Sequence, residues 1–260
     1  MARLPRKLQS LPLVAVCLIA VLAWLAAAVH LGWAASLDAA VAGWFDSHHV
    51  KGWDGASHAV FHLLGPRSVL IVAILCGALL SWKLRSAFPA AIVAGTVGIA
   101  AVVENCLKAI VVKAPWTAAE LLTIPEPLLR DGVSSFPSGH VAGNAALLGI
   151  VAVYFGAGRN GAARIALATV VTVTVLMVSV IVLYVSAHCF SDVIGGAILG
   201  AASVAAGALA RDELHRHFST GYGRKGSVVR PNQRNHRSPP SRQECDQHMR
   251  PSVEILTRYP

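Results

Sequence analysis

The sequence predicts an all-α, polytopic membrane bundle of about six transmembrane helices with short interfacial helices. Of its 260 residues, 55% are hydrophobic and only 13% are charged, whereas soluble domains usually carry about 25% charged residues. Apolar runs near the ~20 residues that span a bilayer recur along most of the chain. The net charge of +9 is uneven, and much of it lies beyond Ala210. We therefore expect a basic N-terminus (1–10), a membrane domain (11–210) and a basic tail (211–260).

The expected helices follow from apolar runs and their boundaries. Leu11–Leu31 should form a retained first transmembrane helix, because its apolar core exceeds the 7–15 residues of a signal peptide. Ser36–Pro66 is aromatic but too polar to span a bilayer, so it should form one or two interfacial helices. Prolines at or near three later helix starts are tolerated there, because the first N–H groups of a helix need no intrahelical partner. The remaining transmembrane helices are expected at Arg67–Trp82, Phe88–Val112, His140–Phe155, Arg164–Ser186 and Asp192–Ala210.

The tail and the cysteines indicate no further catalytic unit. The segment 211–260 lacks hydrophobic periodicity and has the composition of a disordered tail. Its positive charge would favour an anionic membrane leaflet, and no nucleic-acid partner is expected for a tail tethered to a membrane. Five scattered cysteines show neither a disulfide framework nor zinc-ligand spacing. His58 and His62 have helical i,i+4 spacing but no matching third ligand, so neither a metal nor another cofactor is expected.

The distribution of lysine and arginine predicts the orientation. With six spans, the basic segments 3–7, 83–85, 159–164 and the tail all lie on one side. The positive-inside rule makes that side cytoplasmic. Both termini should then be cytoplasmic in a multi-pass plasma-membrane protein. The opposite, extracytoplasmic side would hold His140, His188 and Asp192.

The first candidate motif is Pro137-Ser138-Gly139-His140. Glycine lets the backbone approach an anion closely, and a serine hydroxyl with N–H groups at a helix N-terminus can bind phosphate oxygens. His140 would lie in the first helical turn, where it could donate a proton to a leaving oxygen. The same residues could equally be a helix start followed by an interfacial histidine.

The second candidate motif is His188 with Asp192. Their i,i+4 spacing places both side chains on one helical face. A carboxylate that bonds one ring nitrogen fixes the tautomer and leaves the other nitrogen free as a nucleophile. A structural alternative is that Asp192 only caps the helix, although ionisable groups in so apolar a chain are costly and usually functional.

These motifs resemble those of the type 2 phosphatidic acid phosphatase superfamily of membrane lipid phosphatases. The resemblance rests on Phe136–His140, on Ser186–Gly196, on the spacing between them and on the six-helix layout, and it covers roughly Leu11–Ala210. It implies that His188 attacks phosphorus to form a phosphohistidine and that Asp192 orients it. It also implies that His140 protonates the leaving lipid oxygen, that Ser138 and Gly139 hold phosphate oxygens, and that no metal is required.

The phosphate-binding cations depart from the family pattern. Lys108 matches the family lysine, but the family arginine of that motif falls on Pro115, and the serine-arginine pair of the third motif falls on Ile181-Val182. Losing one such donor commonly costs about 10²–10³ in rate. Lys113 and Arg130 are the available substitutes. Glu104 precedes Lys108 by one helical turn and is expected to pair with it.

Three functions fit this sequence. The first is a phosphatase acting on a prenyl or glycerolipid phosphate or pyrophosphate, with membrane lipids around it. The second is a weak or inactive relative that binds lipid phosphates or transports lipids. The third is a structural membrane subunit. Retention of His140, His188 and Asp192 favours the phosphatase, since neither alternative needs a histidine nucleophile. The sequence indicates no oligomeric state and does not choose among the lipids.

Overall fold

A computed structural model describes residues 6–50, 52–113, 117, 121–122, 128 and 135–225 of the chain. Within these ranges every regular element is helical, and six helices are long and apolar enough to cross a membrane. The predicted all-α, six-span bundle is confirmed. The six are α1 (Arg6–His30), α4 (Pro66–Leu84), α5 (Phe88–Ile110), α8 (Gly139–Gly156), α9 (Gly161–Tyr184) and α10 (Phe190–Lys225).

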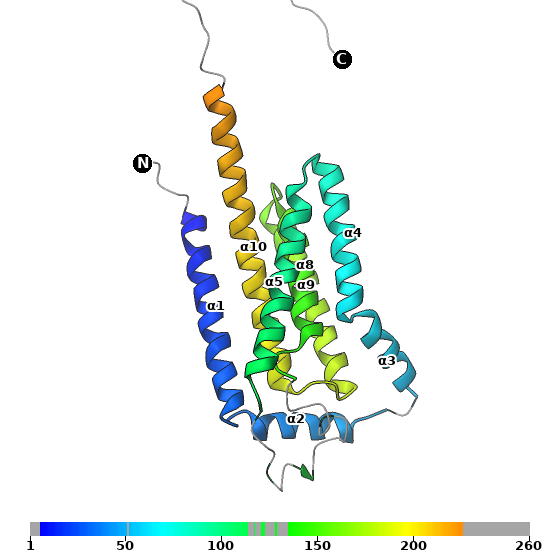
Figure 1. The fold of residues 1–260 in the computed structure, drawn as a ribbon. Coiled ribbons are helices and arrows are strands. Elements are labelled where there is room, and N and C mark those ends of the chain that lie inside the picture. The colour runs from blue at the N-terminus through cyan, green and yellow to red at the C-terminus, as the bar shows by residue number, and fades with distance from the viewer. Residues whose placement is uncertain are drawn as a thin grey trace, which may run out of the picture. The chain divides into compact units, whose positions relative to one another are not determined.

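Two short helices connect the first two spans, as the aromatic stretch predicted. They are α2 (Ala35–Ser47) and α3 (Asp54–Leu63). Figure 1 shows α2 lying across one end of the long helices, roughly perpendicular to them. It is held there by its buried Asp38, which accepts hydrogen bonds from the backbone N–H and the hydroxyl of Ser191 at the start of α10.

The long helices pack through small residues. In membranes, small residues at helix interfaces allow backbones to approach closely. A Cβ atom at Gly200 of α10 would lie 2.9 Å from the backbone oxygen of Ala142 in α8. At Gly207, further along α10, a Cβ atom would collide with Thr96 of α5. The central helix α8 is consequently buried along much of its length, with Val141 and Ile150 fully enclosed.

The last helix is longer than expected. The prediction ended it at Ala210, whereas α10 continues to Lys225. Beyond Ala210 the helix is polar, and exposed pairs one turn apart support it, including Arg216 with Glu213 at 2.8 Å. This polar part of α10 lacks the apolar periodicity by which a helix is predicted from sequence. The chain up to His217 forms one compact unit, and the site and the cavity described below both lie in it.

Candidate active site

Both predicted motifs lie at the same end of the bundle, where α8 and α10 begin. The backbone N–H of Ser138 donates a 2.9 Å hydrogen bond to the backbone oxygen of Asp192. This bond joins the turn Pro137-Ser138-Gly139, called here the serine-glycine turn, to the first turn of α10. A Cβ atom at Gly196 would lie 2.5 Å from the Ser138 backbone oxygen. Glycine at that position therefore lets the two helix starts meet.

The serine-glycine turn has the features of an anion site. Ser138 is the N-cap residue of α8, with extended backbone angles (φ −69°, ψ 116°). It is fully buried, and its hydroxyl oxygen has no hydrogen-bond partner among the described residues. The first N–H groups of a helix also lack intrahelical acceptors. Together these donors can bind an anion at the N-terminus of α8.

His188 and Asp192 lie close together, as expected, but they do not share a helical face, because His188 lies in the bend that precedes Phe190, the first residue of α10. The Nδ1 atom of His188 lies 3.6 Å from Oδ2 of Asp192, an ion-pair distance slightly too long for a hydrogen bond. The carboxylate itself is firmly held, because Oδ2 accepts bonds from the Ser135 hydroxyl at 2.6 Å and from the Cys189 backbone N–H at 2.9 Å. Asp192 is completely buried, and His188 is 9% exposed.

The other oxygen of Asp192 faces Lys113. The Lys113 Nζ atom lies 2.8 Å from Asp192 Oδ1 and 3.9 Å from Asp38 Oδ2, and its side chain is only 6% exposed. Burial acts to lower the pKa of Lys113, but the Asp192 carboxylate outweighs it and the pKa is raised. Burial raises the pKa of Asp38 despite the opposing effect of Lys113. Asp192 is thus shared between an imidazole and a buried ammonium group.

Asp38 is the residue that sequence reasoning missed at this site. In the sequence, Asp38 is one of several acidic residues and has no spacing relation to either motif. Its burial beside Ala39 and Ala42 on α2 arises from the packing of that helix on the bundle. The neighbouring Cys189 is equally buried, and burial raises its pKa to about 12. Its thiol is therefore inert as a nucleophile at neutral pH.

His140 faces His188 from the first turn of α8. The two ring centroids are 6.1 Å apart. The imidazole of His140 stacks on Phe61 of α3, with centroids 4.2 Å apart and an angle of 22° between the rings. The Asn144 amide donates to the backbone oxygens of His140 and Leu64, which fixes α8 to the turn that follows α3. Sequence reasoning missed the contacts made by Phe61 and Asn144, since both depend on tertiary packing.

Lys108 reaches the site from the last turn of α5. Its ammonium donates a 2.6 Å hydrogen bond to Glu104, so the predicted pairing is confirmed. The Glu104 carboxylate also lies against Gly139, because a Cβ atom there would collide with it. An acidic group and a lysine therefore lie beside the serine-glycine turn. Arg130, the other predicted phosphate ligand, lies outside the described residues.

Comparisons with known proteins find similarity in sequence and in fold. Residues 89–216 match the family model described as the PAP2 superfamily. One solved structure with a matching fold is "Crystal structure of the first transmembrane PAP2 type phosphatidylglycerolphosphate phosphatase from Bacillus subtilis". It aligns with a TM-score of 0.57 at 17% identity, over 83% of this chain and 98% of that one. None of the curated proteins compared matches the sequence. The segment 89–216, which contains His140, His188 and Asp192, is by this match a PAP2-superfamily segment.

Proposed function

We propose that this protein is an integral membrane phosphatase that hydrolyses a lipid phosphomonoester or pyrophosphate through a phosphohistidine at His188. The observation that carries the proposal is the meeting of His188, Asp192 and His140 at the serine-glycine turn. Asp192 lies on the Nδ1 side of His188. With the proton on Nδ1, the lone pair of Nε2 is free to attack phosphorus.

Each step of the proposed reaction has a group to perform it. Nε2 of His188 forms a bond to phosphorus while the bond from phosphorus to the lipid oxygen breaks. His140 donates its proton to that leaving oxygen and then accepts a proton from the water that attacks the phosphohistidine. The second attack breaks the phosphorus–nitrogen bond and releases phosphate. The Ser138 hydroxyl, the N–H groups that begin α8 and Lys108 would bind the phosphate oxygens.

Lys113 fits a different task from the one its charge first suggested. Its ammonium already contacts Asp192 and lies near Asp38, and it is buried. We therefore propose that Lys113 positions Asp192, which in turn orients His188. Lys108 would bind phosphate directly after leaving Glu104, and Arg130 stays a predicted phosphate ligand.

A second candidate function is binding or transport of a lipid phosphate without turnover. The contact of Glu104 with Gly139 favours it, because a carboxylate beside the serine-glycine turn repels a phosphate unless it moves away. Both functions need a lipid whose phosphate lies at headgroup depth and whose chains lie in the bilayer. For either function, the distribution of lysine and arginine and the positive-inside rule support a site on the extracytoplasmic side and cytoplasmic termini.

Phosphate release from purified protein tests the proposal. The panel would contain prenyl pyrophosphate, phosphatidic acid, phosphatidylglycerol phosphate and a water-soluble phosphate ester. His188→Ala should abolish release, whereas His58→Ala, an exposed histidine of α3, should leave it unchanged. Circular dichroism would establish that both variants are folded. Release that survives His188→Ala, or a folded wild-type protein that releases phosphate from none of these lipids, would contradict the proposal.

A further inference from the structure

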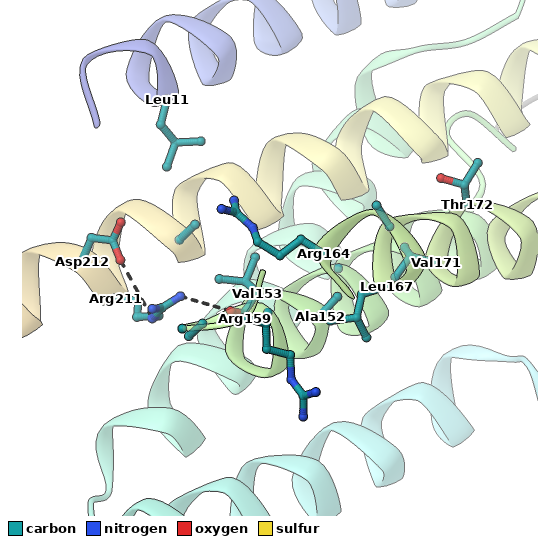
Figure 2. A pocket seen from close by; sticks show the side chains of 16 residues that line it. Leu11, Ala152, Val153, Arg159, Arg164, Leu167, Val171, Thr172, Arg211 and Asp212 are labelled. Atoms are coloured by element: carbon teal, nitrogen blue, oxygen red, sulfur yellow. Dashed lines mark hydrogen bonds and ion pairs between the residues drawn. The ribbon is translucent and has the colours of Figure 1, made fainter. Parts of the chain in front are cut away.

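A cavity of about 690 Å³ lies at the other end of α8 from the histidines. It is formed by α1, α8, α9 and α10, and Figure 2 shows it from close by. His140 lies in the first turn of α8, and Gly156, which lines the cavity, is the last residue of that helix. Their separation is about 24 Å at a rise of 1.5 Å per residue. The volume falls in the range of small-molecule sites, about 300–1,000 Å³. The cavity is therefore separate from the candidate active site and large enough for a ligand.

Arginines dominate the charge of this cavity. Arg159, Arg164 and Arg211 line it together with a single acidic residue, Asp212. The Arg211 guanidinium is already engaged, since it donates to the Val153 backbone oxygen at 3.2 Å and lies 3.9 Å from Asp212. Figure 2 shows these two interactions as dashed lines. Asp212 is thereby paired with Arg211, and the other two arginines give the cavity its net positive charge.

Arg159 and Arg164 are available to a ligand. Arg159 uses its Nε atom to bond the Phe155 backbone oxygen at 2.9 Å, which leaves its terminal amino groups for another acceptor. Across the part of the chain that the structure describes, no hydrogen bond or ion pair to the Arg164 guanidinium is found. Both side chains are exposed. Guanidinium groups bind phosphate oxygens with two parallel hydrogen bonds.

The rest of the cavity wall is apolar. Leu167 and Val171 extend along α9, Ala208 belongs to α10, and Leu11 of α1 faces them from across the cavity in Figure 2. A free phosphate would bind only the arginines and would leave the apolar wall uncovered. A molecule with a negative headgroup and a hydrocarbon chain would satisfy both parts. Because the cavity lies at the ends of membrane-spanning helices, such molecules surround it.

We propose that this cavity binds an anionic phospholipid of the membrane, with its phosphate at Arg164 and one acyl chain along α9 and α1. Arg159, whose side chain points the other way in Figure 2, would add its charge to the attraction of the headgroup. The lipid would connect α1 to α9, and so stabilise the position of the first helix. This inference is independent of the proposed function, because it uses none of the residues near His188.

The test measures lipid retained by the purified full-length chain in detergent, using native mass spectrometry. Phosphatidylglycerol and phosphatidylcholine with identical acyl chains are added at equal concentration. One arginine near an anionic headgroup contributes about 1 kcal/mol, which is roughly fivefold in affinity. Arg159→Gln/Arg164→Gln should therefore weaken phosphatidylglycerol retention roughly 25-fold. The control Arg85→Gln removes an exposed charge that follows α4 at the same end of the bundle, and it should retain the lipid like the wild type.

Further variants distinguish binding in the cavity from general surface attraction and from binding near the histidines. Ala168→Phe keeps every charge but fills the apolar wall, so it should reduce retention while the protein stays folded. Lys108→Ala, at the opposite end, should leave retention unchanged. Equal loss in Arg85→Gln would show general surface attraction, and loss in Lys108→Ala would place the lipid at the other site. Each of these two results would overturn the proposal. So would equal retention of phosphatidylglycerol and phosphatidylcholine, or displacement of phosphatidylglycerol by equimolar glycerol phosphate.

Discussion

Replacing Lys113 by methionine tests how Asp192 is held. The ammonium lies 2.8 Å from Asp192 Oδ1, and both side chains are buried. At an effective dielectric constant of about 20, the attraction at this distance is about 6 kcal/mol, which desolvation of the two charges opposes. Removing one partner of a buried pair typically costs about 3–5 kcal/mol, because the other charge is left uncompensated. We expect Lys113→Met to lower the free energy of unfolding by that amount.

Denaturant titration in micelles measures this change, and a double-mutant cycle isolates its cause. Lys113→Met/Asp192→Asn removes both charges, so its cost should fall short of the sum of the single variants by about 0.5–3 kcal/mol. The control Arg67→Met, at an exposed arginine of α4, should change stability by no more than about 0.5 kcal/mol. In activity assays, loss of positioning should lower kcat with little change in KM. Unchanged stability with a raised KM would refute this reasoning and make Lys113 a phosphate ligand.

Three further predictions concern the packing, the phosphate site and the pH dependence. Gly196→Ala should cost about 1–3 kcal/mol of stability and lower kcat/KM, because its Cβ atom would collide with the backbone of the serine-glycine turn. The control Gly95→Ala, where a Cβ atom meets nothing within 4 Å, should be neutral or slightly stabilising. Equal losses of stability in the two variants would contradict the account. Glu104→Gln should tighten inhibition by inorganic phosphate, because it removes the negative charge paired with Lys108; weaker inhibition would show that the carboxylate assists binding. Because the pKa of Lys113 is raised, its ion pair contributes fully to folding stability below the ordinary pKa of 10.5, and this contribution is lost as pH rises through the raised value. The melting temperature should therefore fall over that pH range more in the wild type than in Lys113→Met. Parallel curves for the two proteins would argue against the pair.

Much of the fold could be predicted because membrane helices are encoded locally. Six apolar runs of spanning length predicted six spans. The expected shared helical face of His188 and Asp192 was wrong, because His188 precedes α10, although the bend still brings the two side chains together. The end of α10 was wrong, because polar helix beyond Ala210 carries no apolar pattern.

The supporting residues of the site could not be predicted in the same way. Asp38 approaches Ser191 from more than a hundred residues away in the sequence, and Phe61 meets His140 only because α3 packs beside α8. Nothing in the local sequence of Lys113 indicates that its ammonium faces two carboxylates. Such contacts are properties of tertiary packing, which short motifs and helical periods do not specify.

The most direct test of the central claim is to trap the enzyme during turnover of a lipid carrying a radiolabelled phosphate. Rapid denaturation at alkaline pH should leave label on the protein, since a phosphohistidine survives base and is released by acid. The account predicts an acid-labile label on the peptide that contains His188, and its absence in His188→Ala. Phosphate release with no labelled protein, or label on any other residue, would contradict a histidine nucleophile at this site.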